Sequence, residues 1–87
     1  MKINPDFVLK DVAGKTIVVP VGEASIDFNG IMTLNKTAAF LFGLLQDDTT
    51  EEELILALTT HYDVSPEQAS KDVKAFIKKL EAHHILI

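Results

Sequence analysis

The hydrophobic pattern in the first third of the chain is that of β-strands. Residues 7–12 and 16–21 are runs of mostly β-branched and apolar residues, and Ala13-Gly14-Lys15 between them has the length and the glycine of a hairpin connection. A third extended segment lies within residues 25–34, where Asn29-Gly30 indicates either a tight turn or a bulge. With a bulge there, a short third strand is left, made of Ile31, Met32, Thr33 and Leu34.

From residue 35 onward the spacing of apolar residues is typical of helices. Asn35 is a favourable N-cap for a helix over residues 36–46, which is apolar nearly all round and is therefore expected to be the central, buried helix. Thr49 and Thr50 each precede a glutamate by three residues, the capping-box spacing at the start of a second helix. The apolar face of this helix comprises Leu54, Ile55, Leu58 and Tyr62.

A third helix has the clearest start signal. Ser65 suits the N-cap, Pro66 the first helical position and Gln68 the capping box. The helix is predicted to run to about Ala82, and residues 85–87 are an apolar tail that should pack on the core. One buried face is predicted from apolar positions that repeat at three and four, namely Ala69, Val73, Phe76, Ile77 and Leu80.

Three short antiparallel strands followed by three helices predict an α+β domain of winged-helix-like layout, with helices covering one face of the sheet. The 87 residues suit one domain, residues 1–87. A chain of this size buries only about two-thirds of its unfolded surface, so a large cleft with several layers of catalytic residues is not expected.

The amino-acid composition argues against several classes of protein. Eight Lys and Arg against 13 Asp and Glu give a net charge of −5, which argues against affinity based on neutralising nucleic-acid phosphates. The absence of cysteine excludes disulfides, zinc thiolates, iron–sulfur clusters and thiol nucleophiles. Residues 1–6 do not resemble a secretory signal, and the longest apolar stretch, residues 38–45, is far shorter than the roughly 20 residues of a membrane span. We therefore expect a soluble, cytoplasmic protein.

No cluster of residues predicts catalysis, a metal or a cofactor. His83 and His84 are adjacent near a helix end and His61 ends another helix, so interaction with helix dipoles explains them. The acidic residues 47–48 and 51–53 fall in a turn and a first helical turn, where the dipole favours acids that remain solvated. No serine lies in a nucleophile elbow and no glycines form a phosphate loop. We expect no enzymatic activity.

Lys71, Lys74 and Lys78 form a basic stripe on one side of the third helix. A solvated face is the simplest interpretation, and a contact surface for an acidic peptide is the main alternative. Binding to duplex DNA ranks third, because all eight basic residues are lysines and Glu67 and Asp72 lie on or beside the stripe.

The predicted third strand is a second candidate site. Residues 31–34 contain neither the charge nor the proline that usually blunts a sheet edge. An open edge beside a helix can accept a guest strand, whose backbone pairs with the edge while a groove selects its side chains. The same edge could pair with a second copy of the chain, giving a homodimer. The pattern is equally compatible with a strand that is central or covered by the C-terminal tail.

Several segments resemble the PqqD-like family. They are Val19-Pro20-Val21-Gly22, then Phe28-Asn29-Gly30-Ile31-Met32-Thr33-Leu34-Asn35-Lys36-Thr37-Ala38-Ala39, and Phe42 with Leu44-Leu45. The pattern continues through Thr50-x-x-Glu53-Leu54, Tyr62-Asp63-Val64-Ser65 and Phe76-Ile77 to Ile85-Leu86, so it spans essentially the whole chain. The family is named for the peptide chaperone of pyrroloquinoline quinone biosynthesis. Its fold is also the peptide-recognition element of ribosomally made, post-translationally modified peptides.

The resemblance implies a non-catalytic module that binds the leader of a precursor peptide and presents it to a modifying enzyme, often a radical S-adenosylmethionine enzyme. In the family the leader adds to the third strand and lies in the groove toward the third helix. Neither a nucleic acid nor a membrane is then an expected partner; a winged-helix DNA-binding or transcription-associated domain is the alternative function. Carried over, the implied peptide-binding residues are Ile31, Met32, Thr33 and Leu34 on the strand, with Lys71, Lys74, Ala75 and Lys78 on the helix because acidic leaders would suit lysines.

Two positions depart from the family pattern. Phe42 stands where the family frequently has tryptophan, which keeps an aromatic core residue. His84 stands where glycine usually precedes the last apolar residues, so the helix stop is expected to be weaker and the terminal turn altered.

Overall fold

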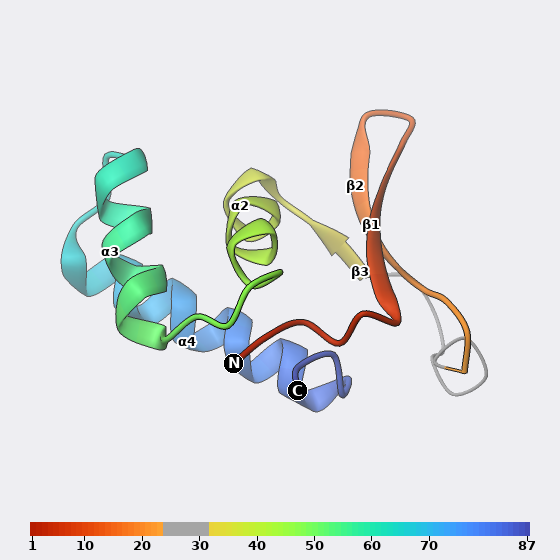
Figure 1. Cartoon of the computed structure of the whole chain (residues 1–87). Helices are drawn as coiled ribbons and strands as arrows, with labels where there is room; N and C mark the ends of the chain where they lie inside the picture. Colours follow the sequence, from red (N-terminus) through yellow and green to blue (C-terminus); the bar gives the residue numbers. More distant parts are fainter. Residues whose placement is uncertain (24–31) are drawn as a thin grey trace.

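The structure is a computed structural model that describes residues 1–23 and 32–87. Its elements are β1 (Phe7–Val12), β2 (Lys15–Pro20), β3 (Met32–Leu34), α2 (Lys36–Leu44), α3 (Glu51–His61) and α4 (Pro66–Ala82) (Figure 1). The strands pair antiparallel in the order β1-β2-β3. The predicted α+β fold of three antiparallel strands followed by three helices is confirmed. Ile31 and the turn or bulge predicted at Asn29-Gly30 lie outside the described residues.

The β1–β2 hairpin closes through a two-residue turn. Ala13 and Gly14 both have positive φ, 52° and 80°, as a type I′ turn requires. Val12 and Lys15 lie opposite each other on either side of the turn. The predicted hairpin is therefore confirmed, and β2 begins one residue earlier than expected because Lys15 already pairs with β1.

Local capping explains where the three helices begin. The side-chain oxygens of Asn35, Thr50 and Ser65 each accept a hydrogen bond from the backbone N–H three residues on, at 2.8, 3.1 and 3.1 Å. Thr49, the other capping candidate, is buried, and its hydroxyl lies 2.9 Å from the carbonyl oxygen of Leu44. These caps confirm the helix starts that the sequence indicates.

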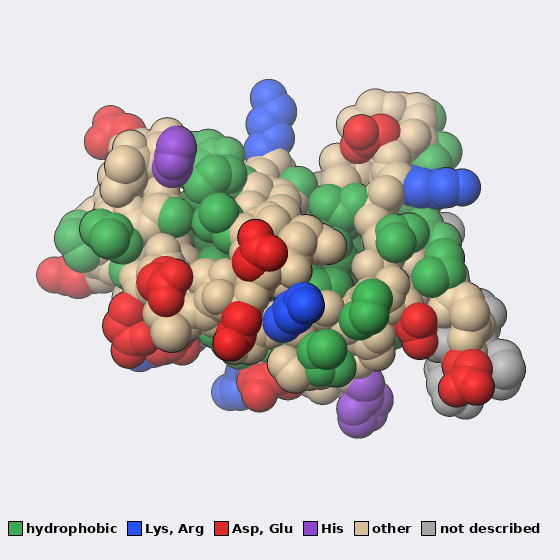
Figure 2. All heavy atoms as spheres, viewed as in Figure 1, with side chains coloured by type: hydrophobic (Ala, Val, Ile, Leu, Met, Phe, Trp, Pro, Cys, Tyr) green, Lys and Arg blue, Asp and Glu red, His purple; other side chains and the backbone are tan. Residues whose placement is uncertain are grey.

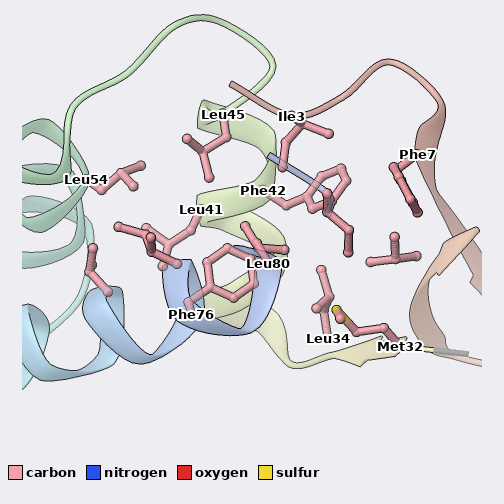
Figure 3. Close-up of a cluster of buried hydrophobic side chains, with 14 of the residues drawn as sticks. Ile3, Phe7, Met32, Leu34, Leu41, Phe42, Leu45, Leu54, Phe76 and Leu80 are labelled. Carbon is pink, nitrogen blue, oxygen red and sulfur yellow. The ribbon is translucent and has the colours of Figure 1, made fainter. Parts of the chain in front are cut away.

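One hydrophobic core lies between the sheet and the helices (Figure 3). α4 contributes the buried face that the sequence predicts, and α3 packs on α4 and α2, on the side away from the sheet (Figure 1). α2 is less buried than expected: Leu41 and Phe42 are enclosed, whereas Phe40 and Leu44 are only half-buried. On this half-buried side of α2, Phe40 packs beside the exposed rings of His61 and Tyr62, with ring centroids 5.0 and 5.5 Å away.

The two chain ends lie side by side and join distant parts of the fold (Figure 1). The N–H of Ile3 donates to the carbonyl of Leu45 at 2.8 Å, and the N–H of Asn4 donates to the carbonyl of Ile85 at 2.7 Å. Ile85 is fully buried, which confirms that the apolar tail packs on the core. At the surface, the N-terminal ammonium of Met1 donates a 2.8 Å hydrogen bond to Asp48 and lowers the pKa of that carboxyl group.

α4 ends in a Schellman turn. The N–H of Ile85 donates to the carbonyl of Leu80 at 2.9 Å, and the N–H of His84 donates to the carbonyl of Glu81 at 3.1 Å. His84 has a φ of 57°, the left-handed conformation that the usual glycine adopts without strain. The expectation of an altered terminal turn is therefore wrong, because the backbone hydrogen bonds hold a histidine in the conformation of the glycine.

Phe42→Ala is expected to lower the free energy of unfolding by about 3–5 kcal/mol, because the ring is 1% exposed at the centre of the core. Urea denaturation measures the loss. Phe40→Ala is the matched control, since it removes the same ring from a half-buried position and should cost clearly less. Equal losses for the two variants would contradict the core assignment, and Phe42→Leu keeps the comparison measurable if Phe42→Ala does not fold.

His84→Gly is expected to raise the free energy of unfolding by about 0.5–1 kcal/mol. Relief of the left-handed strain exceeds the conformational entropy that glycine loses on folding. Thermal denaturation of the variant beside His84→Ala tests the cause, because alanine removes the imidazole but retains the Cβ atom. A gain in both variants would mean that the imidazole, rather than the backbone conformation, is unfavourable.

Candidate functional site

Backbone groups of β2 alternate between its two neighbours. Just beyond the β1–β2 ladder, the N–H of Val21 donates to the carbonyl of Asp6 at 2.7 Å. In an antiparallel ladder every second residue bonds to the same neighbour. The backbone N–H and C=O groups of the odd-numbered residues of β2 therefore point toward β1. Those of Thr16 and Val18 point toward β3.

This alternation determines which part of β3 is accessible. Leu34 lies opposite Thr16 and Met32 opposite Val18, so the backbone groups of these two β3 residues face β2. Thr33, between them, turns its N–H and C=O away from β2, to the side where the described residues provide no further strand. The Met32 and Leu34 side chains are buried in the core while Thr33 is exposed. The predicted open edge therefore centres on Thr33.

A groove of about 300 Å³ lies beside this edge, between β3, the first turns of α2 and α4. Its apolar lining comes from all three elements and includes Leu34, Ala38, Leu41, Ala75 and Phe76. Figure 3 shows Leu34, Leu41 and Phe76 converging from β3, α2 and α4. An added strand at Thr33 would therefore have an apolar cleft on one of its faces.

α4 lines the groove with one flank of its buried face. Asp72, Ala75, Phe76 and Lys79 recur at spacings of three and four, so they occupy adjoining positions on one side of the helix. Phe76 belongs both to this flank and to the core. The Ser65 cap and the buried face together orient α4 and thereby place this flank opposite β3.

The structure divides the predicted peptide-binding residues into two groups. Thr33, Leu34 and Ala75 line the groove, while Met32 is buried on the same strand and Ile31 lies outside the described residues. The basic stripe is exposed and does not line the groove; it consists of Lys71, Lys74 and Lys78. A role for any of these residues in peptide binding stays a prediction.

Lys79, Asp72 and Phe76 line the groove but were missed by sequence reasoning. The sequence held only a partial signal for them: they lie beside the predicted buried face of α4, but the apolar period does not show which border of that face meets β3. The stripe was selected by charge alone, and its lysines point away from the core on the opposite side of the helix from Val73.

The other candidate residues have structural explanations. His61 ends α3 and His83 is the C-cap of α4. Glu51, Glu52 and Glu53 occupy the first turn of α3, where Figure 2 shows acidic side chains gathered on the surface. Within residues 1–23 and 32–87, no group of three or more histidine, aspartate or glutamate side chains is placed so that it could hold a metal ion. No helix in these parts of the chain is long and apolar enough to cross a membrane.

The fold and the groove define a small α+β domain with an accessible sheet edge. Residues 8–86 match the sequence profile of the family described as coenzyme PQQ synthesis protein D (PqqD). The chain therefore belongs to the PqqD family. No curated protein sequence matches it.

Two solved structures resemble the chain over nearly its whole length. TbiB1 in complex with the TbiA(beta) leader peptide has a TM-score of 0.77 at 19% identity, covering 99% of this chain and 94% of that chain. Lasso peptide synthetase B1, complexed with the leader peptide, has a TM-score of 0.71 at 21% identity, covering 93% and 89% respectively. At these identities the likeness establishes the fold.

Proposed function

We propose that this protein is a non-catalytic module that captures the leader of a ribosomally made precursor peptide by strand addition at β3. The observation that carries the proposal is the outward backbone of Thr33 beside an apolar groove. The membership of this chain in the PqqD family supports the proposal, as does its likeness to two proteins whose structures were solved with leader peptides. The bound leader would be presented to a modifying enzyme of the radical S-adenosylmethionine type.

Strand addition uses two different parts of the site. The N–H and C=O of Thr33 would pair with one guest residue, as in an antiparallel ladder. Alternate guest side chains would then enter the groove between Leu34, Leu41 and Phe76. Backbone pairing tolerates many guest sequences, whereas the groove distinguishes among them.

The charges of the chain do not favour the DNA-binding alternative. The net charge is −5 and no arginine is present to read guanine. The described groove carries one acidic and one basic side chain, Asp72 and Lys79, rather than a basic surface. We also propose no catalytic role, because the groove-lining residues contain no nucleophile paired with a base.

Thr33→Pro is expected to abolish leader binding, with at least a tenfold loss of affinity, because proline removes the outward N–H of the edge. Isothermal titration calorimetry measures the binding, and circular dichroism checks that the variant is folded. Thr33→Ala retains the N–H and should bind nearly normally. Asp11→Pro makes a matched change on the outer side of β1 and should also retain binding. Normal affinity of Thr33→Pro would place the guest elsewhere.

An amide NMR titration with the leader of a precursor peptide encoded beside this protein tests the proposed function directly. We expect saturable shifts at Met32, Thr33 and Leu34 and along the α4 flank that contains Ala75 and Lys79. Sedimentation analysis before and after peptide addition tests whether a second copy occupies the same edge. Saturable shifts confined to the opposite side of the sheet, or unchanged spectra at millimolar peptide, would contradict the proposal.

A further inference from the structure

The two charged side chains of the groove lie at separate positions along α4. Asp72 and Lys79 are seven residues apart, about 10.5 Å along a helix axis. Between them the groove wall is apolar and is formed by Ala75 and Phe76, with Leu41 opposite on α2. The groove therefore presents an acid, an apolar centre and a base in sequence.

Neither charge is neutralised by an ion pair among the described residues. The salt bridge found there joins the Met1 ammonium to Asp48. Asp72 accepts a 2.8 Å hydrogen bond from the amide of Gln68, a neutral donor that leaves the carboxylate charged. Both groups are exposed at the groove, so an incoming peptide would meet one negative and one positive charge.

The topology relates these charges to the direction of a guest strand. β3 runs toward α2, whereas α4 runs back toward the sheet (Figure 1). Because α4 approaches the sheet as the chain proceeds (Figure 1), Lys79, which follows Asp72 along α4, is nearer the β3 end of the groove. A guest antiparallel to β3, the commoner and slightly more stable pairing, would pass Asp72 first and Lys79 later.

We propose that Asp72 and Lys79 select a leader segment in which a basic, an apolar and an acidic side chain follow one another at alternate positions. This inference rests on the proposed function and adds the chemistry of the ligand. Alternate side chains of a strand are about 6.6 Å apart, so three of them span the two charges and the apolar centre. The reverse order places like charges together, which weakens binding and excludes wrong partners.

Two synthetic peptides of identical composition test the charge order. Each is a valine- and threonine-based strand with lysine, leucine and glutamate at alternate positions in one peptide, and glutamate, leucine and lysine in the other. NMR titration of the native protein at low salt should show about a five- to tenfold preference for the first peptide. The preference should fall at about 0.5 M salt, because the Debye length is then shorter than in physiological buffer and the charges on the groove and the peptide are more strongly screened.

The exchange variant Asp72→Lys with Lys79→Asp keeps the net charge and should invert the preference. Lys15→Asp, at the distant hairpin turn, is a control for a single charge change and should retain the preference of the native protein. Circular dichroism of each variant verifies that the fold is intact.

The outcomes separate this inference from the proposed function. Equal affinity for the two peptides, with shifts at Thr33, overturns the charge rule and leaves strand addition standing. A preference of the native protein for the reversed peptide, or an uninverted preference in the exchange variant, also overturns the inference. If neither peptide nor the encoded leader binds at millimolar concentration, the proposed function fails together with the inference.

Discussion

The site depends on the burial of two side chains, Met32 and Leu34, which are 5% and 6% exposed. β3 has three residues and, among the described residues, pairs with β2 alone, so its own ladder gives it little stability. The two anchors fasten it to the core. Because side chains and backbone groups alternate with the same period of two, that anchoring also turns the backbone of Thr33 outward. A short strand is thereby held firmly while its edge stays accessible.

α4 forms the opposite wall because several weak constraints act on it together. Ser65 determines where it begins, its buried face determines its rotation, and the Schellman turn at His84 determines where it ends. The N-terminal segment then joins the turn through the hydrogen bond from Asn4 to Ile85. The position of α4 relative to the β3 edge is consequently a property of the whole fold.

Much of this architecture could be predicted from the sequence because caps, turns and apolar periods are local signals. The hairpin and the three helix starts are confirmed, and β3 is an outer strand of the sheet that the described residues form. The choice between Thr49 and Thr50 could not be made, because both precede a glutamate by three residues and only packing buries the Thr49 hydroxyl. The groove flank was also out of reach: periodicity shows which face of α4 is buried, but not which border of that face meets β3. Charge alone therefore favoured the lysine stripe over Lys79.

In the proposed function, the backbone atoms of β3 give affinity for the leader, and the side chains of the groove give selectivity among leaders. Hydrogen bonds to the Thr33 backbone do not depend on the guest's side chains, so they suit any leader that can extend. Selectivity must then come from the groove: part of its lining belongs to the core, whereas Asp72, Ala75 and Lys79 are exposed positions of α4 that the core does not constrain. Core and edge can persist while these positions change.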